Sequence, residues 1–442
     1  MTLATPLLAL LAAAALWDRP FTVERAGEVT AAVSARCGGC SWASPSRTGA
    51  MLILDVDGRY SQHLPLTRGE GPAEYRVHLG ALGAGPHRLR LRVDARASPH
   101  AVRDVAVEDV RVTATAPDAP EYRALAYAPV LHPRPNAVGR YTDVPLLMWY
   151  ETDQTPRGTR IRYSVVFSNE DGGTPADRLL ATWGRLTDIE YVFGVELDEY
   201  GRVLEATYQA KDHKILPYGG LVAGRRPALW VVTDNNMVSA RGVTRPVYAP
   251  APVPFDLAST SREAVMDANP WTYQVSSQEA LREGRVDETP APGSHRIPDP
   301  RRYVYVEACA ETRDATLTFG VAVDGAQGLR WAESDAGQKE YRIVRQSSEF
   351  PNGCFRGAAA LPADAAGAPL RALRFRAYTR RPREGEAPLP PGAGQASLVR
   401  VNRVFRLDRD FLPGPDLFRW KGTLPLAVDG PAAEIAMTAP HF

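Results

Sequence analysis

Asp188 and Glu190 are the two side chains whose types and spacing best suit chemistry. They lie two positions apart at the start of Ile189–Leu197, whose alternating apolar residues predict a β-strand, so both carboxylates should point to the same face. Two such carboxylates can hold a hard cation, or can divide acid and base roles when their burial differs. The commoner interpretation is a strand end whose carboxylates pair with Arg185 or Arg178, because ion pairs outnumber active sites.

A second group of oxygen ligands surrounds the acidic loop Asn169–Gly173. Asp171 in this loop and Asp177 just after it are the candidate metal ligands, although the alternating aspartates of a dedicated calcium loop are missing. We therefore expect no cofactor, and calcium is the one ion that these ligands leave open. The eight histidines are scattered singly, so no zinc cluster can be assigned.

Four aromatic residues in the central part of the chain could form a sugar-binding surface. Flat rings stack on sugar faces as they do on other apolar planes. Within alternating strands, however, such rings are more often part of the core. The candidate ligand-binding residues are Trp149, Trp183, Tyr191 and Trp230.

Composition and missing motifs exclude several functional classes. The net charge is +1, with 52 basic and 51 acidic residues, which argues against nucleic-acid binding and against electrostatic membrane binding. The sequence contains no G-x-S-x-G, H-E-x-x-H, P-loop or dinucleotide fingerprint. An enzymatic role therefore has little support from motifs.

The first residues and the cysteines both indicate export. Leu7–Leu16 is a short apolar run in which Ala13-Ala14-Ala15 supply small residues for cleavage. This predicts a signal peptide over residues 1–15, although no Lys or Arg precedes the run. No later stretch approaches the length of a membrane span, so we expect a secreted, periplasmic or cell-surface protein without a transmembrane segment in the mature chain.

In an oxidising compartment, four cysteines predict two disulfides. Cys37 and Cys40 should form a local bridge, which we prefer to a redox or zinc motif because no second C-x-x-C lies nearby. Cys309 and Cys354 should form a structural bridge that closes a long loop.

The 442 residues are too many for one core, and 38 prolines and 36 glycines are scattered between short alternating segments. We predict an all-β protein of three antiparallel, jelly-roll-like β-sandwich domains with few short helices. The domains should span residues 18–118, 119–290 and 300–442, and the central one should contain helices near Ser259–Met266 and Ser276–Glu283. Ser276 or Ser277 is the expected N-cap of the second helix.

The first and last domains repeat one order of sequence motifs. In each domain, an apolar strand ending in Asp-Gly precedes a Glu-Tyr-Arg segment, and an alternating arginine-rich strand follows. This order predicts two copies of one sandwich, although short motifs of this kind also recur by chance. The corresponding segments are Leu54–Gly58, Glu74–Val77 and Leu89–Val93, then Val321–Gly325, Glu340–Ile343 and Leu373–Ala377.

Residues of the central domain, about Ala128–Ala240, carry a resemblance to a known family. The segments Tyr141-Thr142-Asp143-Val144-Pro145, Ile161–Gly173, Thr187-Asp188-Ile189-Glu190 and Arg226–Val232 are similar to the vacuolar protein sorting-associated family of the sixty-two type, whose β-rich domain has no known function. Two departures stand out. Ile189 replaces a Trp, and Thr233-Asp234-Asn235-Asn236 replaces Ser-His-Ala, so an activity at those positions of the family is not expected here.

These observations favour an exported, non-catalytic binding or surface protein whose partner is a glycan or a cell-envelope component. One alternative is a polysaccharide hydrolase or lyase that uses Asp188 and Glu190. Another is a structural subunit of an extracellular assembly. The aromatic rings favour the first interpretation, the paired carboxylates the second and the modular build the third.

Overall fold

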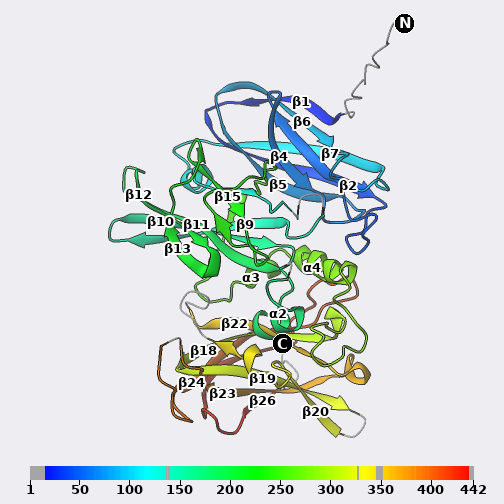
Figure 1. Ribbon diagram of the computed structural model, residues 1–442, viewed down its shortest axis with the longest axis vertical. Helices are drawn as coiled ribbons and strands as arrows, with labels where there is room; N and C mark the ends of the chain where they lie inside the picture. Colours follow the sequence, from blue (N-terminus) through cyan, green and yellow to red (C-terminus); the bar gives the residue numbers. More distant parts are fainter. Residues whose placement is uncertain are drawn as a thin grey trace, which may run out of the picture.

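The computed structural model describes residues 15–135, 137, 140–170, 172–325, 328–344, 352–383 and 385–437. The predicted signal peptide, except for its last residue, and the metal candidate Asp171 lie outside these residues. β-Strands dominate the described part, and its α-helices are few and short, which confirms the all-β prediction. Three β-rich bodies follow one another along the long axis, in the order of the sequence (Figure 1).

The N-terminal body is a sandwich of two sheets in the strand orders β1-β6-β3-β4 and β5-β2-β7, with all pairings antiparallel. Its strands alternate between inward apolar and outward polar residues, so Val29, Val33, Leu52 and Leu91 meet in one core. The strands are β1 (Ala15–Val23), β2 (Gly27–Gly38), β3 (Met51–Val56), β4 (Arg59–Pro65), β5 (Ala73–Leu82), β6 (Gly85–Val93) and β7 (Asp104–Thr115).

The central body contains a six-stranded sheet, β13-β12-β11-β10-β9-β17, and a smaller sheet of β14, β15, β16 and β8. Most pairings are antiparallel, but the short strands β8 and β17 pair in parallel with β15 and β9. The strands are β8 (Val130–His132), β9 (Pro145–Thr155), β10 (Gly158–Phe167), β11 (Asp188–Leu197), β12 (Val203–Ala210), β13 (Lys214–Pro217), β14 (Val222–Ala223), β15 (Arg226–Val231), β16 (Val238–Ser239) and β17 (Pro252–Pro254).

The α-helices also belong to this central part of the chain and are α1 (Tyr122–Ala126), α2 (Ala176–Trp183), α3 (Ala264–Asp267) and α4 (Trp271–Arg282). The sequence prediction for α4 was wrong at its start. The helix begins five residues earlier, after Pro270, which lacks a capping side chain. Ser276 and Ser277 lie buried inside the helix, not at its N-terminus.

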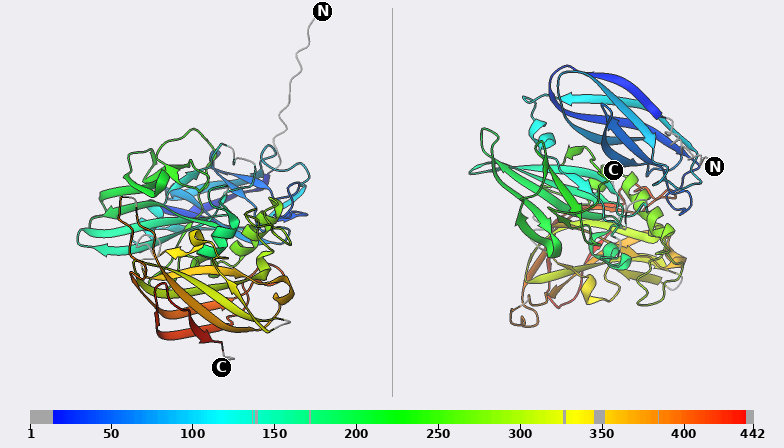
Figure 2. Two further views of the ribbon diagram at one scale, coloured as in Figure 1. Left: turned by 60° about the horizontal axis from the view of Figure 1, so that its bottom comes forward. Right: turned by 45° about the horizontal axis from the view of Figure 1, so that its top comes forward.

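The C-terminal body again has two sheets, β22-β18-β24-β25 and β20-β19-β23-β26, with β21 on the free edge of β19. Figure 2 shows this body, yellow to red, against the central one. The strands are β18 (Tyr303–Arg313), β19 (Ala315–Gly325), β20 (Gly328–Glu333), β21 (Ile343–Val344), β22 (Cys354–Ala360), β23 (Leu370–Thr379), β24 (Gln395–Phe405), β25 (Phe418–Leu426) and β26 (Ala433–Ala436).

The two outer sandwiches share their strand order. The sheet β5-β2-β7 corresponds to β22-β18-β24, and β6-β3-β4 corresponds to β23-β19-β20. One equivalence expected from the sequence was wrong: Glu74–Val77 lies in β5, but residues 339–341 form a 3₁₀ turn, and β22 takes the position of β5. Tyr341 is buried in this turn, and its hydroxyl donates to Asp177 at 2.7 Å, so docking onto α2 overrides the strand-like pattern.

Both predicted disulfides are present. Cys37 is bonded to Cys40 at the end of β2, and Cys309 on β18 is bonded to Cys354 on β22. The second bridge joins neighbouring strands of one sheet and closes a loop with a sequence separation of 45.

Candidate ligand-binding groove

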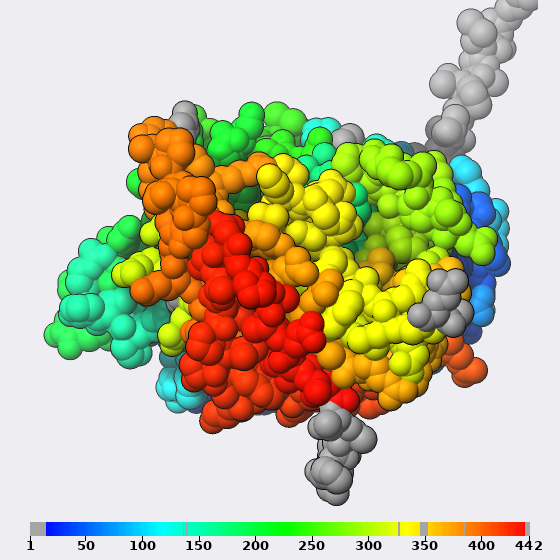
Figure 3. All heavy atoms as spheres, turned by 90° about the horizontal axis from the view of Figure 1, so that it is seen from below, coloured from blue at the N-terminus to red at the C-terminus, as the bar shows by residue number. Residues whose placement is uncertain are grey.

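One face of the six-stranded sheet carries a groove of about 410 Å³. Strands β9 to β13 form its floor, and the segment that precedes α3 adds Leu257 and Arg262 at its side. Figure 3 shows the outer end of this central region, in teal, projecting beyond the C-terminal sandwich. The volume is that of an ordinary small-ligand site.

The polar lining of the groove is balanced in charge. Arg160, Arg162 and Arg262 are matched by the three glutamates Glu151, Glu196 and Glu205. Arg162 lies 3.6 Å from Glu151, and Arg160 lies 3.4 Å from Glu196. The groove therefore offers guanidinium donors and carboxylate acceptors side by side, without a net charge that would select an ionic ligand.

Glu196 is the most firmly held of these groups. Thr155 donates to one of its carboxylate oxygens at 2.6 Å, and Arg157 contacts both oxygens. The Thr155 hydrogen bond and those from Arg157 and Arg160 lower the pKa of Glu196, because they favour its charged form. This carboxylate is thus an anion with fixed partners and not a proton donor.

Tyr191 contributes the aromatic surface of the groove. Its ring is half-buried on β11, and its hydroxyl lies 3.0 Å from the Thr207 hydroxyl on β12. Gln209, two positions further along β12, also lines the groove. These residues place a ring beside hydroxyl and amide groups, an arrangement that suits the apolar faces and the hydroxyls of a sugar.

Asp188 and Glu190, the predicted catalytic pair, lie on β11 but are not lining residues of this groove. Their residues are only 2% and 8% exposed. Asn236 donates to Asp188 at 3.0 Å, and Arg185 lies 3.6 Å from the same carboxylate, which confirms the expected arginine partner. Gln209 lines the groove and donates to Glu190, so it connects this carboxyl to the groove.

A third carboxyl, Glu170, joins the buried pair. Burial and the nearby charge of Asp188 raise the pKa of Glu170 to about 7, even though Thr174 donates to it at 2.7 Å. Burial also raises the pKa of Asp188, and burial together with Asp188 raises that of Glu190 well above the usual value. Near neutral pH, the cluster therefore retains protons that free carboxyls would already have released.

The three tryptophans do not gather on one surface. Trp149 is fully buried in the core beside α2 and α4, and Trp183 packs against the core of the C-terminal sandwich. Trp230 stacks on His132 at 4.5 Å and donates to the carbonyl of Thr244 at 3.1 Å. Of the four aromatic candidates, Tyr191 is the one that lines the groove.

Asp177, a predicted metal ligand, is occupied by other contacts. The backbone N–H of Arg178 binds one carboxylate oxygen at 2.9 Å, and the Tyr341 hydroxyl binds the other at 2.7 Å. Across the ranges that the structure describes, no three His, Cys, Asp or Glu side chains form a metal-binding group. Asp171 lies outside those ranges, so calcium binding stays a prediction.

The sequence prediction missed most of the groove. Arg160, Arg162, Glu205, Thr207 and Gln209 lie on alternating positions of β10 and β12, which face the same side of the sheet. That alternation was the available signal, because polar side chains recur there where a fully covered strand would be apolar. Arg262 had no such signal, since it reaches the groove from a distant segment.

No family model and no curated protein matches this chain. The resemblance of the central domain to the vacuolar protein sorting-associated family therefore stays a prediction. Among solved structures, the chain is similar to the C-terminal domain of EclA, described as a sugar-binding protein, with 14% identity over 23% of this chain and 68% of that chain. The TM-score is 0.18, too low to support an argument about fold or ligand. No helix in the described part of the chain has the length and apolar character needed to cross a membrane.

Proposed function

We propose that the protein is an exported, non-catalytic glycan-binding protein whose central groove holds an uncharged oligosaccharide, as found in cell-envelope material. The observation that carries this proposal is the groove itself, in which Tyr191 lies among three arginines and three glutamates. A sugar hydroxyl both donates and accepts hydrogen bonds, so neighbouring guanidinium and carboxylate groups match it in both roles. The two disulfides support an oxidising compartment.

An uncharged ligand fits the groove better than an acidic one. Arg160 and Arg162 already have carboxylate partners within 4 Å. An acidic polymer would have to displace those partners or rely on Arg262 alone. The ligand should therefore bind with little dependence on salt, in contrast to polyanions held by charge.

Binding to an array of neutral and acidic oligosaccharides, followed by titration calorimetry with the best ligand, tests the proposal. Tyr191→Ala removes the stacking ring and should weaken binding about tenfold or more. Tyr200→Ala is the matched control, because Tyr200 is 74% exposed in the turn between β11 and β12, outside the groove. If acidic ligands alone bind, or both variants bind as the wild type does, the proposal is wrong.

The hydrolase alternative has one specific observation in its favour. Glu190 has a raised pKa, as a general acid needs, and it contacts Gln209 at the edge of the groove. Asp188, however, is only 2% exposed and is already bound by Asn236 and Arg185. Turnover of a bound polysaccharide that Glu190→Gln abolishes, with binding retained, would establish this alternative and overturn the non-catalytic one.

A further inference from the structure

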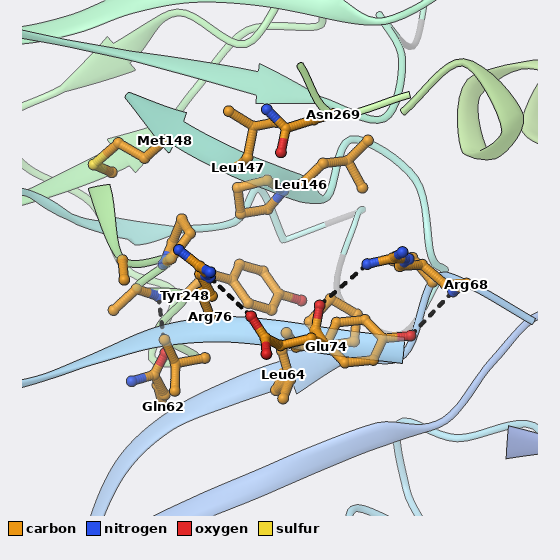
Figure 4. Close-up of a pocket in the computed structure, with 18 of the residues that line it drawn as sticks. Gln62, Leu64, Arg68, Glu74, Arg76, Leu146, Leu147, Met148, Tyr248 and Asn269 are labelled. Atoms are coloured by element: carbon orange, nitrogen blue, oxygen red, sulfur yellow. Dashed lines mark hydrogen bonds and ion pairs between the residues drawn. The ribbon is translucent and has the colours of Figure 1, made fainter. Parts of the chain in front are cut away.

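A separate cavity of about 370 Å³ lies between the N-terminal sandwich and the central body. No sequence pattern predicts this cavity, because its two walls come from segments far apart in the chain. Figure 4 shows one wall formed by Leu146, Leu147, Met148 and Asn269, and the opposite wall formed by Gln62, Leu64, Glu74 and Arg76.

The cavity is held in shape by the proline-rich segment 246–254, which acts as a bridge between the two bodies. His78 donates to the carbonyl of Ala249 at 2.8 Å, and Ala251 donates to that of Arg76 at 3.1 Å, both through the backbone. On the other side, Tyr248 exchanges two backbone hydrogen bonds with Leu131 at 2.8 and 2.9 Å. The cavity is therefore formed before any ligand binds, as small-ligand sites usually are.

The charged residues that line the cavity differ in whether they have an ion-pair partner. Arg76 binds the Glu74 carboxylate at 2.9 Å, and Arg111 binds the same carboxylate from outside the cavity. Hydrogen bonding to Arg76 lowers the pKa of Glu74, which stays an anion and neutralises Arg76. His63 lies between Tyr60 and Asp94, and burial lowers its pKa.

Arg68 is the cation in the cavity lining that these contacts do not pair with a carboxylate. One nitrogen, Nη1, donates to the backbone carbonyl of Glu74 at 3.2 Å, and the guanidinium lies 4.9 Å from the ring centre of Trp271. Among the residues that the structure describes, Nε and Nη2 of Arg68 have no hydrogen-bond partner. These two N–H groups lie on one edge of the guanidinium and form the parallel fork that binds both oxygens of a carboxylate.

We propose that this cavity binds an amphipathic carboxylic acid. The carboxylate accepts from Nε and Nη2 of Arg68, and the apolar body of the ligand packs against Leu146, Leu147 and Trp271. A monoanion matches the single unpaired guanidinium. A phosphate dianion would need a second free cation, and Arg76 is already neutralised by Glu74.

Titration calorimetry with 4-phenylbutyrate, and with the neutral 4-phenylbutyramide as a charge-free analogue, tests this site. 4-Phenylbutyrate should bind saturably. 4-Phenylbutyramide should bind at least about tenfold more weakly, because Nε and Nη2 of Arg68 need a partner with two acceptor oxygens. Arg68→Gln should weaken carboxylate binding about tenfold, whereas Arg59→Gln, at an exposed arginine of the same sandwich outside the cavity, should leave it unchanged.

Leu146→Trp provides a second variant, which fills the cavity while Arg68 is retained, and it should also abolish binding. Thermal melts show whether each variant folds. Tyr191→Ala, which removes the stacking ring of the glycan groove, should not change the affinity for phenylbutyrate. The carboxylate site and the glycan groove are therefore tested independently. Absence of saturable binding to the wild type, equal binding of the amide, or unchanged binding in Arg68→Gln would overturn the proposal.

Discussion

At the scale of single residues, the buried carboxyls illustrate which features of a site can be predicted from sequence and which cannot. Spacing alone brought Asp188 and Glu190 together and indicated Arg185 as a partner, because strand periodicity and near neighbours are local properties. Glu170 and Asn236 come from loops before and after β11, and their approach depends on tertiary packing. The raised pKa values follow from that packing and have no sequence signal.

The proton held by Glu170 makes stability depend on pH. Its pKa rises from 4.5 to about 7 on folding, so the folded state binds a proton that the unfolded state releases between these values. The resulting stabilisation is complete below about pH 4.5 and is lost as the pH rises through about 7. Glu170→Gln, which has no proton to release, should lose less free energy of unfolding than the wild type between about pH 5 and pH 8.

Urea unfolding of both proteins across this range measures the difference. His78 acts in the opposite direction, since burial lowers its pKa from 6.5 to about 4 and stability falls as the pH drops through this interval. That contribution is common to the wild type and the variant and cancels in the comparison. Parallel pH profiles for the two proteins would show that Glu170 does not carry the proton.

At the scale of elements, alternation predicted most strands because each sandwich strand buries one face. The prediction failed where tertiary contacts decide the conformation. Glu340 and Tyr341, which were expected to correspond to part of Glu74–Val77, lie in a 3₁₀ turn over residues 339–341, and α4 starts at Trp271 without a capping side chain. In both places, docking against a neighbouring element replaces the local signal.

The two disulfides should differ in what they contribute. In the chain-entropy model, the loop of Cys309 and Cys354, with a sequence separation of 45, is worth about 4 kcal/mol of unfolding free energy, and the short loop of Cys37 and Cys40 about 2 kcal/mol. Replacing the first pair by serines should therefore lower the unfolding free energy more than replacing the second pair. Denaturant unfolding of the two double variants makes the comparison, and an equal or reversed order would contradict it.

At the scale of the whole molecule, the three bodies are joined by specific polar contacts that no sequence pattern predicts. Arg356 on β22 is fully buried and binds Asp267 on α3, with a second contact to Glu307 on β18. Tyr273 on α4 adds its hydroxyl to the same group. The helices of the central body and a sheet of the C-terminal sandwich thus share one buried ion network.

Arg356→Met should destabilise the protein by about 3–5 kcal/mol, because it leaves the buried Glu307 carboxylate without its cation and removes one of the two arginines that bind Asp267. Arg371→Met is the matched control: it removes the exposed pair with Asp324 in the same sandwich and should have no measurable effect. Thermal unfolding of the two variants measures the contrast. Similar losses in both would show that the network does not join the bodies as described.

The central claim concerns a sugar on the open face of the six-stranded sheet, and a crystal structure of the protein with its best neutral oligosaccharide tests it most directly. The account predicts a sugar ring over Tyr191, with hydroxyls bound to the paired arginines and glutamates of β9 to β12. A sugar bound elsewhere, with the Tyr191 groove filled by solvent, would contradict it.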